Sequence, residues 1–101
     1  MVLIVTTIHK KEDAQKIGKG LLTHRLIVCY NLFPIESAFW WKGKIEEGNE
    51  TMMIMKTKKE NFGNVEEFIQ KNSGYEVPEV IQINVSKVNK PYLLWLESEV
   101  K

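Results

Sequence analysis

The sequence predicts a single α+β domain of the ferredoxin-like β-α-β-β-α-β type, spanning residues 1–101 and built on long antiparallel strands. The continuous apolar run Val2–Ile8 is typical of a central strand that is covered on both faces. Lys11–Arg25 and Glu60–Asn72 carry apolar residues at helical spacing. The stretch 26–58 between them has the patterns of β-strands, so the helices and strands alternate as this fold requires.

The stretch from Leu26 to Lys58 predicts three consecutive strands of an antiparallel meander. Leu26–Ile35 is apolar at nearly every position, and Ser37–Glu46 alternates between apolar and charged residues. Glu47-Gly48-Asn49 is a short turn signal, after which Glu50–Lys58 is predicted to return as the third strand. Merging or bending these long strands gives the two middle strands of the β-α-β-β-α-β pattern.

The length of these strands is the first indication of an interface. Ten residues in a strand span about 33 Å, whereas helices of about 14 residues span only about 21 Å. The alternation places Phe39, Trp41 and Ile45 on one face of their strand and leaves Trp40 on the charged face. Since exposed apolar patches usually mark interfaces, we expect other copies of the chain to complete the sheet.

Two glycines in the first predicted helix indicate close packing. Gly18 and Gly20 each cost about 1 kcal/mol of helix stability relative to alanine. We therefore expect the helix to approach the sheet closely at these two positions.

The C-terminal part of the chain completes the predicted fold. Val80–Val85 alternates, with Ile81, Ile83 and Val85 expected to point inward, and Tyr92–Val100 is predicted to form a short helix. The two crossover connections place both long helices on one face of the sheet. The other face still carries large apolar residues and must be covered.

Composition excludes several classes of function. With 14 basic and 13 acidic residues the net charge is +1, which predicts no nucleic-acid partner and no anionic membrane partner. One cysteine excludes an internal disulfide, and no apolar run is long enough to span a membrane. The N-terminus lacks the pattern of a signal peptide, so we expect a cytoplasmic location.

Short motifs distributed over nearly the whole chain carry a family resemblance. In order, they are Cys29-x-Asn31, Pro34, Ser37, Trp41-Lys42-Gly43-Lys44-Ile45, Lys56-Thr57, Tyr75-Glu76-Val77-Pro78-Glu79-Val80-Ile81 and Tyr92-Leu93-x-Trp95-Leu96. Their order and spacing resemble those of the CutA divalent-ion-tolerance proteins, which are related in fold to the PII signalling trimers. The chain departs from that family at Ser73-Gly74, where the family commonly has His-Pro.

The resemblance implies a non-enzymatic homotrimer that takes part in metal tolerance or signalling. It would bind a divalent metal ion of the copper type, or a small ligand, in clefts between subunits, with no obligatory cofactor. The implied ligand positions are Cys29, Ser73 and Glu79, and Cys29 matches a cysteine proposed to bind copper in the family. Since a serine hydroxyl is a poor ligand for copper or zinc, we expect weak metal binding.

The residues also allow other interpretations. Cys29 lies in an apolar strand, where a free cysteine is commonly just a buried side chain, and Glu79 could pair with a lysine such as Lys56. Tyr75, Trp40, Trp41 and Trp95 could line a cleft, although such residues are also common at interfaces. The alternative function is a small acylphosphatase-type enzyme, whose phosphate cradle would need Arg25, the one arginine.

Overall fold

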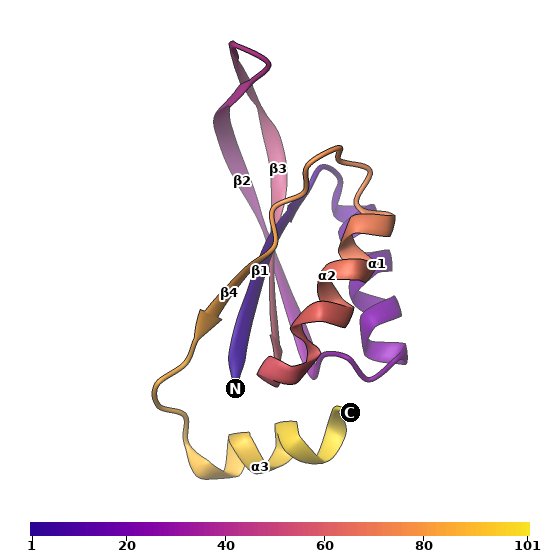
Figure 1. Ribbon diagram of the computed structural model, residues 1–101, viewed down its shortest axis with the longest axis vertical. Helices are drawn as coiled ribbons and strands as arrows, with labels where there is room; N and C mark the ends of the chain where they lie inside the picture. The colour runs from indigo at the N-terminus through magenta and orange to yellow at the C-terminus, as the bar shows by residue number, and fades with distance from the viewer.

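The computed structural model describes residues 1–101 as four strands, three α-helices and one 3₁₀ turn (Figure 1). In chain order these are β1 (Val2–Ile8), α1 (Lys11–Thr23), β2 (Cys29–Trp41), β3 (Lys44–Thr57), η1 (Lys59–Asn61), α2 (Phe62–Asn72), β4 (Ile81–Asn84) and α3 (Lys90–Glu99). Both predicted long helices are present. The first ends two residues earlier than expected, and the second begins with the 3₁₀ turn.

The sheet has the strand order β2-β3-β1-β4, with every neighbouring pair antiparallel. Helices α1 and α2 lie together on one face of this sheet (Figure 1). This arrangement confirms the predicted α+β, ferredoxin-like fold.

The core lies between this sheet and its two helices. Along β1, alternate side chains are fully buried and partly buried, so the strand is covered completely on the helix side alone. The prediction that β1 is covered on both faces is therefore wrong for a single chain. The largest fully buried side chains of this core are Ile4, Ile8, Leu21, Ile27, Met53, Met55 and Ile69.

Gly18 marks the close approach of α1 to the sheet that the sequence predicted, whereas Gly20 approaches helix α2 and not the sheet. A Cβ atom on Gly18 would lie 2.6 Å from Cδ2 of Tyr30 on β2, and one on Gly20 would lie 2.6 Å from Cζ of Phe68 on α2. Both distances are far below van der Waals contact, so α1 fits against its neighbours because these two positions carry no side chain.

The predicted three-strand meander is a single long hairpin in the structure. β2 and β3 pair continuously from Cys29 opposite Lys56 to Trp41 opposite Lys44. The turn is Lys42-Gly43 rather than the predicted Glu47-Gly48-Asn49. Lys42 and Gly43 have φ angles of 50° and 79°, as a two-residue turn of type I′ requires. Pro34 lies within β2, where an outer strand tolerates the missing N–H.

The face of the sheet away from α1 and α2 remains largely open. Phe33 and Phe39 on β2, and Ile81 and Ile83 on β4, are each between 44% and 48% exposed. The prediction that Ile81 and Ile83 point into the core is therefore wrong within one chain. They pair with Val5 and Leu3 of β1, whose side chains point away from the helices, so they share that open face.

Helix α3 lies apart from the other two helices, across the end of the sheet next to the N-terminus (Figure 1). Leu96 and Val100 pack against Val28 there, in a small core of their own. Nη1 of Arg25 donates hydrogen bonds to the Glu99 carbonyl oxygen at 2.9 Å and to Glu99 Oε2 at 3.0 Å. None of the helices is long and apolar enough to cross a membrane.

Candidate functional site

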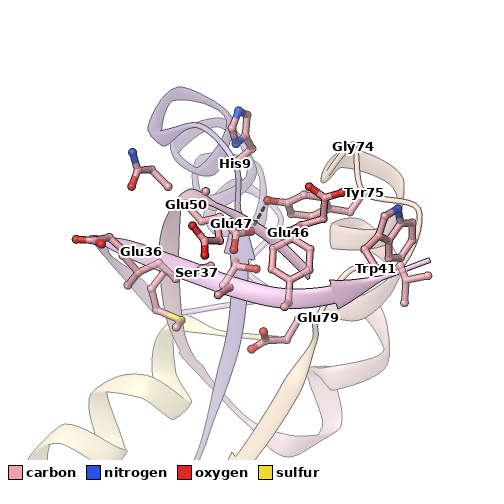
Figure 2. Close-up of a pocket in the computed structure, with 18 of the residues that line it drawn as sticks. His9, Glu36, Ser37, Trp41, Glu46, Glu47, Glu50, Gly74, Tyr75 and Glu79 are labelled. Atoms are coloured by element: carbon pink, nitrogen blue, oxygen red, sulfur yellow. Dashed lines mark hydrogen bonds between the residues drawn. The ribbon is translucent and has the colours of Figure 1, made fainter. Parts of the chain in front are cut away.

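A cleft of about 800 Å³ lies along the distal half of the β2–β3 hairpin and is called here the hairpin cleft (Figure 2). The hairpin contributes residues 35–39, 46–50, Trp41 and Met52. Thr7 and His9 come from the end of β1 and the residues that follow it, and residues 74–77 and Glu79 come from the loop before β4. The cleft is therefore built from three separate parts of the chain.

The loop between α2 and β4 is held in place at both of its ends. Gly74 has a φ angle of +80°, which suits glycine where a helix ends, and the Ser73 hydroxyl accepts a hydrogen bond from the Tyr75 N–H at 3.2 Å. At the other end, Thr6 Oγ1 donates to the Glu79 carbonyl oxygen at 2.6 Å. These contacts fix one wall of the hairpin cleft.

A hydrogen bond between Tyr75 and Glu50 joins this loop to the hairpin. The Tyr75 hydroxyl donates to Oε2 of Glu50 at 2.5 Å, and Figure 2 shows the tyrosine pointing at that carboxylate. Burial raises the pKa of Glu50, but the hydroxyls of Tyr75, Ser37 and Thr7 and the charge of His9 together lower it below its ordinary value. Burial, followed by the bond to Glu50, raises the pKa of Tyr75. The pair therefore holds a carboxylate beside a neutral phenol.

The lining of the hairpin cleft combines negative charge with aromatic rings. Its glutamates are Glu36, Glu46, Glu47, Glu50, Glu76 and Glu79, and His9 is its one basic side chain. Phe39, Trp41 and Tyr75 add aromatic surface. At the tip of the hairpin, Nζ of Lys42 lies 5.5 Å from the centroid of the Trp41 ring and 3.9 Å from Oε2 of Glu76.

The three predicted ligand residues do not converge within one chain. Glu79 lines the hairpin cleft, and Ser73 is buried at the end of α2, next to the cleft but not in its lining. Cys29 starts β2 at one edge of the sheet, in line with Lys56 and Leu3, whereas Glu79 precedes β4 at the other edge, beside Thr6. The two residues are therefore about 14 Å apart across the sheet alone, at three strand spacings, and are further separated along the strands. No group of three His, Cys, Asp or Glu side chains is placed to hold a metal ion.

Cys29 has its own polar surroundings. It is partly buried, and its Sγ lies 3.8 Å from the hydroxyl of Tyr92 on α3. Lys56 is its partner across the hairpin and donates to Asn31 Oδ1 at 3.3 Å, so the suggested pairing of Lys56 with Glu79 does not form within one chain. Within one chain, this cysteine belongs to the packing of α3 on the sheet.

Sequence reasoning found only part of the cleft. Tyr75 and Trp41 line it as suggested, but Trp40 points to the other face of the hairpin, and Trp95 lines a smaller hollow near Arg25. The prediction missed Glu50 because it placed the turn at Glu47-Gly48-Asn49. With the turn there, Glu50 could not be recognised as lying on the same face of the hairpin as Trp41. Strict alternation from Met52 back to Glu50 was the signal that could have found it.

Comparison with known proteins agrees with the fold and with the sequence motifs. A family profile described as CutA1 divalent ion tolerance protein matches residues 2–99. The divalent-cation tolerance protein CutA of Pyrococcus horikoshii is 42% identical over 101 residues, which cover 100% of this chain and 99% of the relative.

Solved structures give the same result. The crystal structure of CutA1 from Pyrococcus horikoshii is 40% identical and superposes with a TM-score of 0.95, covering 100% of this chain and 99% of the other. The structure of the periplasmic divalent cation tolerance protein CutA from Archaeoglobus fulgidus is 37% identical, with a TM-score of 0.97 and full coverage of both chains. The chain therefore belongs to the CutA divalent ion tolerance family.

Proposed function

We propose that this protein is a homotrimeric, non-enzymatic divalent-cation tolerance protein that binds a divalent cation or a small ligand in clefts completed by neighbouring subunits. The non-enzymatic part of the proposal is supported by the family, which is named for ion tolerance rather than for a reaction. The cytoplasmic location predicted above stays a prediction, since the Archaeoglobus fulgidus relative is described as periplasmic.

The open apolar face of the sheet is the observation that carries the assembly. Phe33, Phe39, Ile81 and Ile83 lie nearly half exposed on the face that no helix covers. At the hairpin tip, Trp40 is 72% exposed and sits opposite Ile45, which is 62% exposed. Surfaces of this kind are interfaces far more often than free solvent-facing patches. Covering them with further copies of the chain removes apolar area from water on both faces of the hairpin.

Assembly also supplies what a single chain lacks for binding a metal ion. Cys29 and Glu79 stand at opposite edges of the sheet, so a cation could contact both only if a neighbouring subunit brings one of them closer. A soft thiolate with one carboxylate suits a copper-type ion only when other donors fill the remaining positions. We therefore expect binding of Cu²⁺ or Zn²⁺ to be weak and to depend on assembly.

Two measurements test this proposal. Light scattering at micromolar concentration should give a mass about three times the 11.8 kDa of one chain. Calorimetric titration with Cu²⁺ and Zn²⁺ should then give dissociation constants no tighter than about micromolar, and Cys29→Ala should weaken them further. A monomer at micromolar concentration would contradict the assembly, and Cu²⁺ binding that is unchanged in Cys29→Ala would remove that residue from the site.

Replacing Ser73 by histidine tests the predicted ligand set directly. Ser73→His introduces an imidazole at the position where the family commonly has one, and it should tighten Cu²⁺ binding by at least tenfold if Cys29 and Glu79 approach it in the trimer. Ser98→His, on the exposed face of α3, controls for the addition of a histidine as such. Because Ser73 is buried, an unchanged circular dichroism spectrum of Ser73→His is required as well. Equal effects of the two variants would show that these three positions do not form a metal site.

A further inference from the structure

We propose that the hairpin cleft binds an organic ammonium ion, such as a diamine or polyamine, in preference to a transition-metal ion. This inference rests on the proposed function in one respect, because it takes the cleft as the ligand site of the assembled protein. It goes further by naming the chemical class of the small ligand.

The distribution of charge in the cleft is the first reason. Glu46 and Glu50 lie on the hairpin face that carries Trp41, Glu76 and Glu79 lie on the opposing loop, and Glu36 and Glu47 lie on the other face of the hairpin with Trp40. No three of these glutamates converge as a metal site requires. A polyamine carries several positive charges spaced along one chain, so it can meet separated carboxylates one at a time. His9 is the only basic side chain in the lining, so the net charge of the cleft favours a cation.

The aromatic lining is the second reason. Phe39, Trp41 and Tyr75 present ring surface to the same space as the carboxylates. Ring faces attract ammonium groups within about 6 Å of their centroids and also cover the methylene carbons between them. A hydrated metal ion makes neither the ring–ammonium contact nor the ring–methylene contact, whereas an organic ammonium ion makes both.

The protein's own ammonium group supplies the third and most specific reason. Nζ of Lys42 lies 5.5 Å from the Trp41 ring centroid and 3.9 Å from a carboxylate oxygen of Glu76. An ammonium ion is thus already held between a ring and a carboxylate of the cleft. The side chains of Lys42 and Glu76 are 71% and 69% exposed in the single chain, so no contact within the chain prevents a solute from displacing the lysine.

The test is calorimetric titration of the assembled protein with spermidine, with Mg²⁺ and Zn²⁺ as separate titrants. Spermidine should bind, Trp41→Leu should weaken it roughly two- to fivefold, and Glu76→Gln should weaken it by a similar factor. Lys42→Met should tighten binding, because it removes the competing ammonium group. Lys44→Met is the matched control, because Lys44 lies across from Trp41 and its loss changes the net charge equally.

The outcomes separate this inference from the proposed function. If Lys42→Met and Lys44→Met tighten spermidine binding equally, and Trp41→Leu has no effect, the attraction is general electrostatics and the inference is wrong. If Zn²⁺ or Mg²⁺ binds and spermidine gives no heat, the inference fails while the proposed function stands. If light scattering shows a monomer, the proposed function fails by itself. Both Trp41→Leu and Glu76→Gln must keep the mass in solution and the circular dichroism spectrum of the unaltered protein. If Trp41→Leu disturbs assembly, the comparison of Glu76→Gln with the unaltered protein decides the test.

Discussion

Gly18→Ala should destabilise the protein, although alanine favours helices over glycine. In the interior of α1 the substitution by itself would gain about 1 kcal/mol of helix stability. The new Cβ would, however, lie 2.6–2.8 Å from three ring atoms of Tyr30, among them Cγ at 2.8 Å. Cγ is the ring atom nearest the β2 backbone, so the ring cannot swing away easily. Overpacking of this kind costs about 1–3 kcal/mol, which leaves a net loss of about 1 kcal/mol.

Two other glycines provide matched controls for this reasoning. Gly20→Ala meets Phe68 at Cζ, the far end of its ring, which can move aside, so we expect a change close to zero. Gly63 lies in the first turn of α2 with no atom within 4 Å of its added Cβ, so Gly63→Ala should stabilise by about 0.5–1 kcal/mol. The predicted order of stability is therefore Gly63→Ala above the unaltered protein, and Gly18→Ala below it.

Denaturation in guanidinium chloride at one fixed protein concentration checks this order. Fixed concentration matters because assembly stabilises the folded state by mass action. If Gly18→Ala raises the unfolding midpoint as much as Gly63→Ala does, the contact between α1 and Tyr30 is not as close as described. The explanation of these glycines by packing would then be wrong.

Trp40→Glu should lower the mass in solution from that of the proposed trimer towards that of a monomer, because it would place a charge in the proposed subunit interface at a cost of several kcal/mol per site. An unchanged mass and melting temperature would make Trp40 a plain surface residue. Tyr75→Phe should destabilise the protein at neutral pH by removing the hydrogen bond to Glu50. A lowered carboxyl pKa stabilises the folded state at pH values above the ordinary 4.5, and that contribution is lost as the pH falls through the lowered pKa. The stability difference between Tyr75→Phe and the unaltered protein should therefore shrink in acid, and a constant difference from pH 7 to pH 3 would refute the role given to Glu50.

Apart from the hairpin, where two strands replace the predicted three, the order of elements could be predicted from the sequence because each element has a strong local pattern. The apolar run of β1, the helical spacing in α1 and α2, and the glycines at 18 and 20 are all properties of neighbouring residues. These signals depend on burial against one face, which the sequence shows directly.

The turn of the hairpin could not be predicted by the same reasoning. Glu47-Gly48-Asn49 has the better turn composition, yet the chain turns at Lys42-Gly43, where a lysine adopts a positive φ angle. Pairing along thirteen residues of β2 outweighs the local cost at Lys42, and such a long-range effect leaves no local signature. Because the turn was predicted at the wrong residues, Glu50 was not predicted to line the hairpin cleft. The prediction that Ile81 and Ile83 point into the core was wrong for a related reason. Alternation of apolar and polar residues shows that one face of a strand is apolar, but it does not show whether the same chain covers that face.

The long outer strand β2 has a consequence for how the newly made chain must behave. Its outer edge of thirteen residues has no partner strand in the single chain, and unpaired edges of this length are templates for aggregation. Pro34 interrupts the row of N–H groups midway, so a foreign strand cannot extend along the whole edge. Charged residues at the hairpin tip, Lys42, Lys44 and Glu46 among them, repel further growth. Recovery of folded protein after dilution from denaturant should therefore depend on competition between correct assembly and edge-to-edge association, with Pro34 favouring the former.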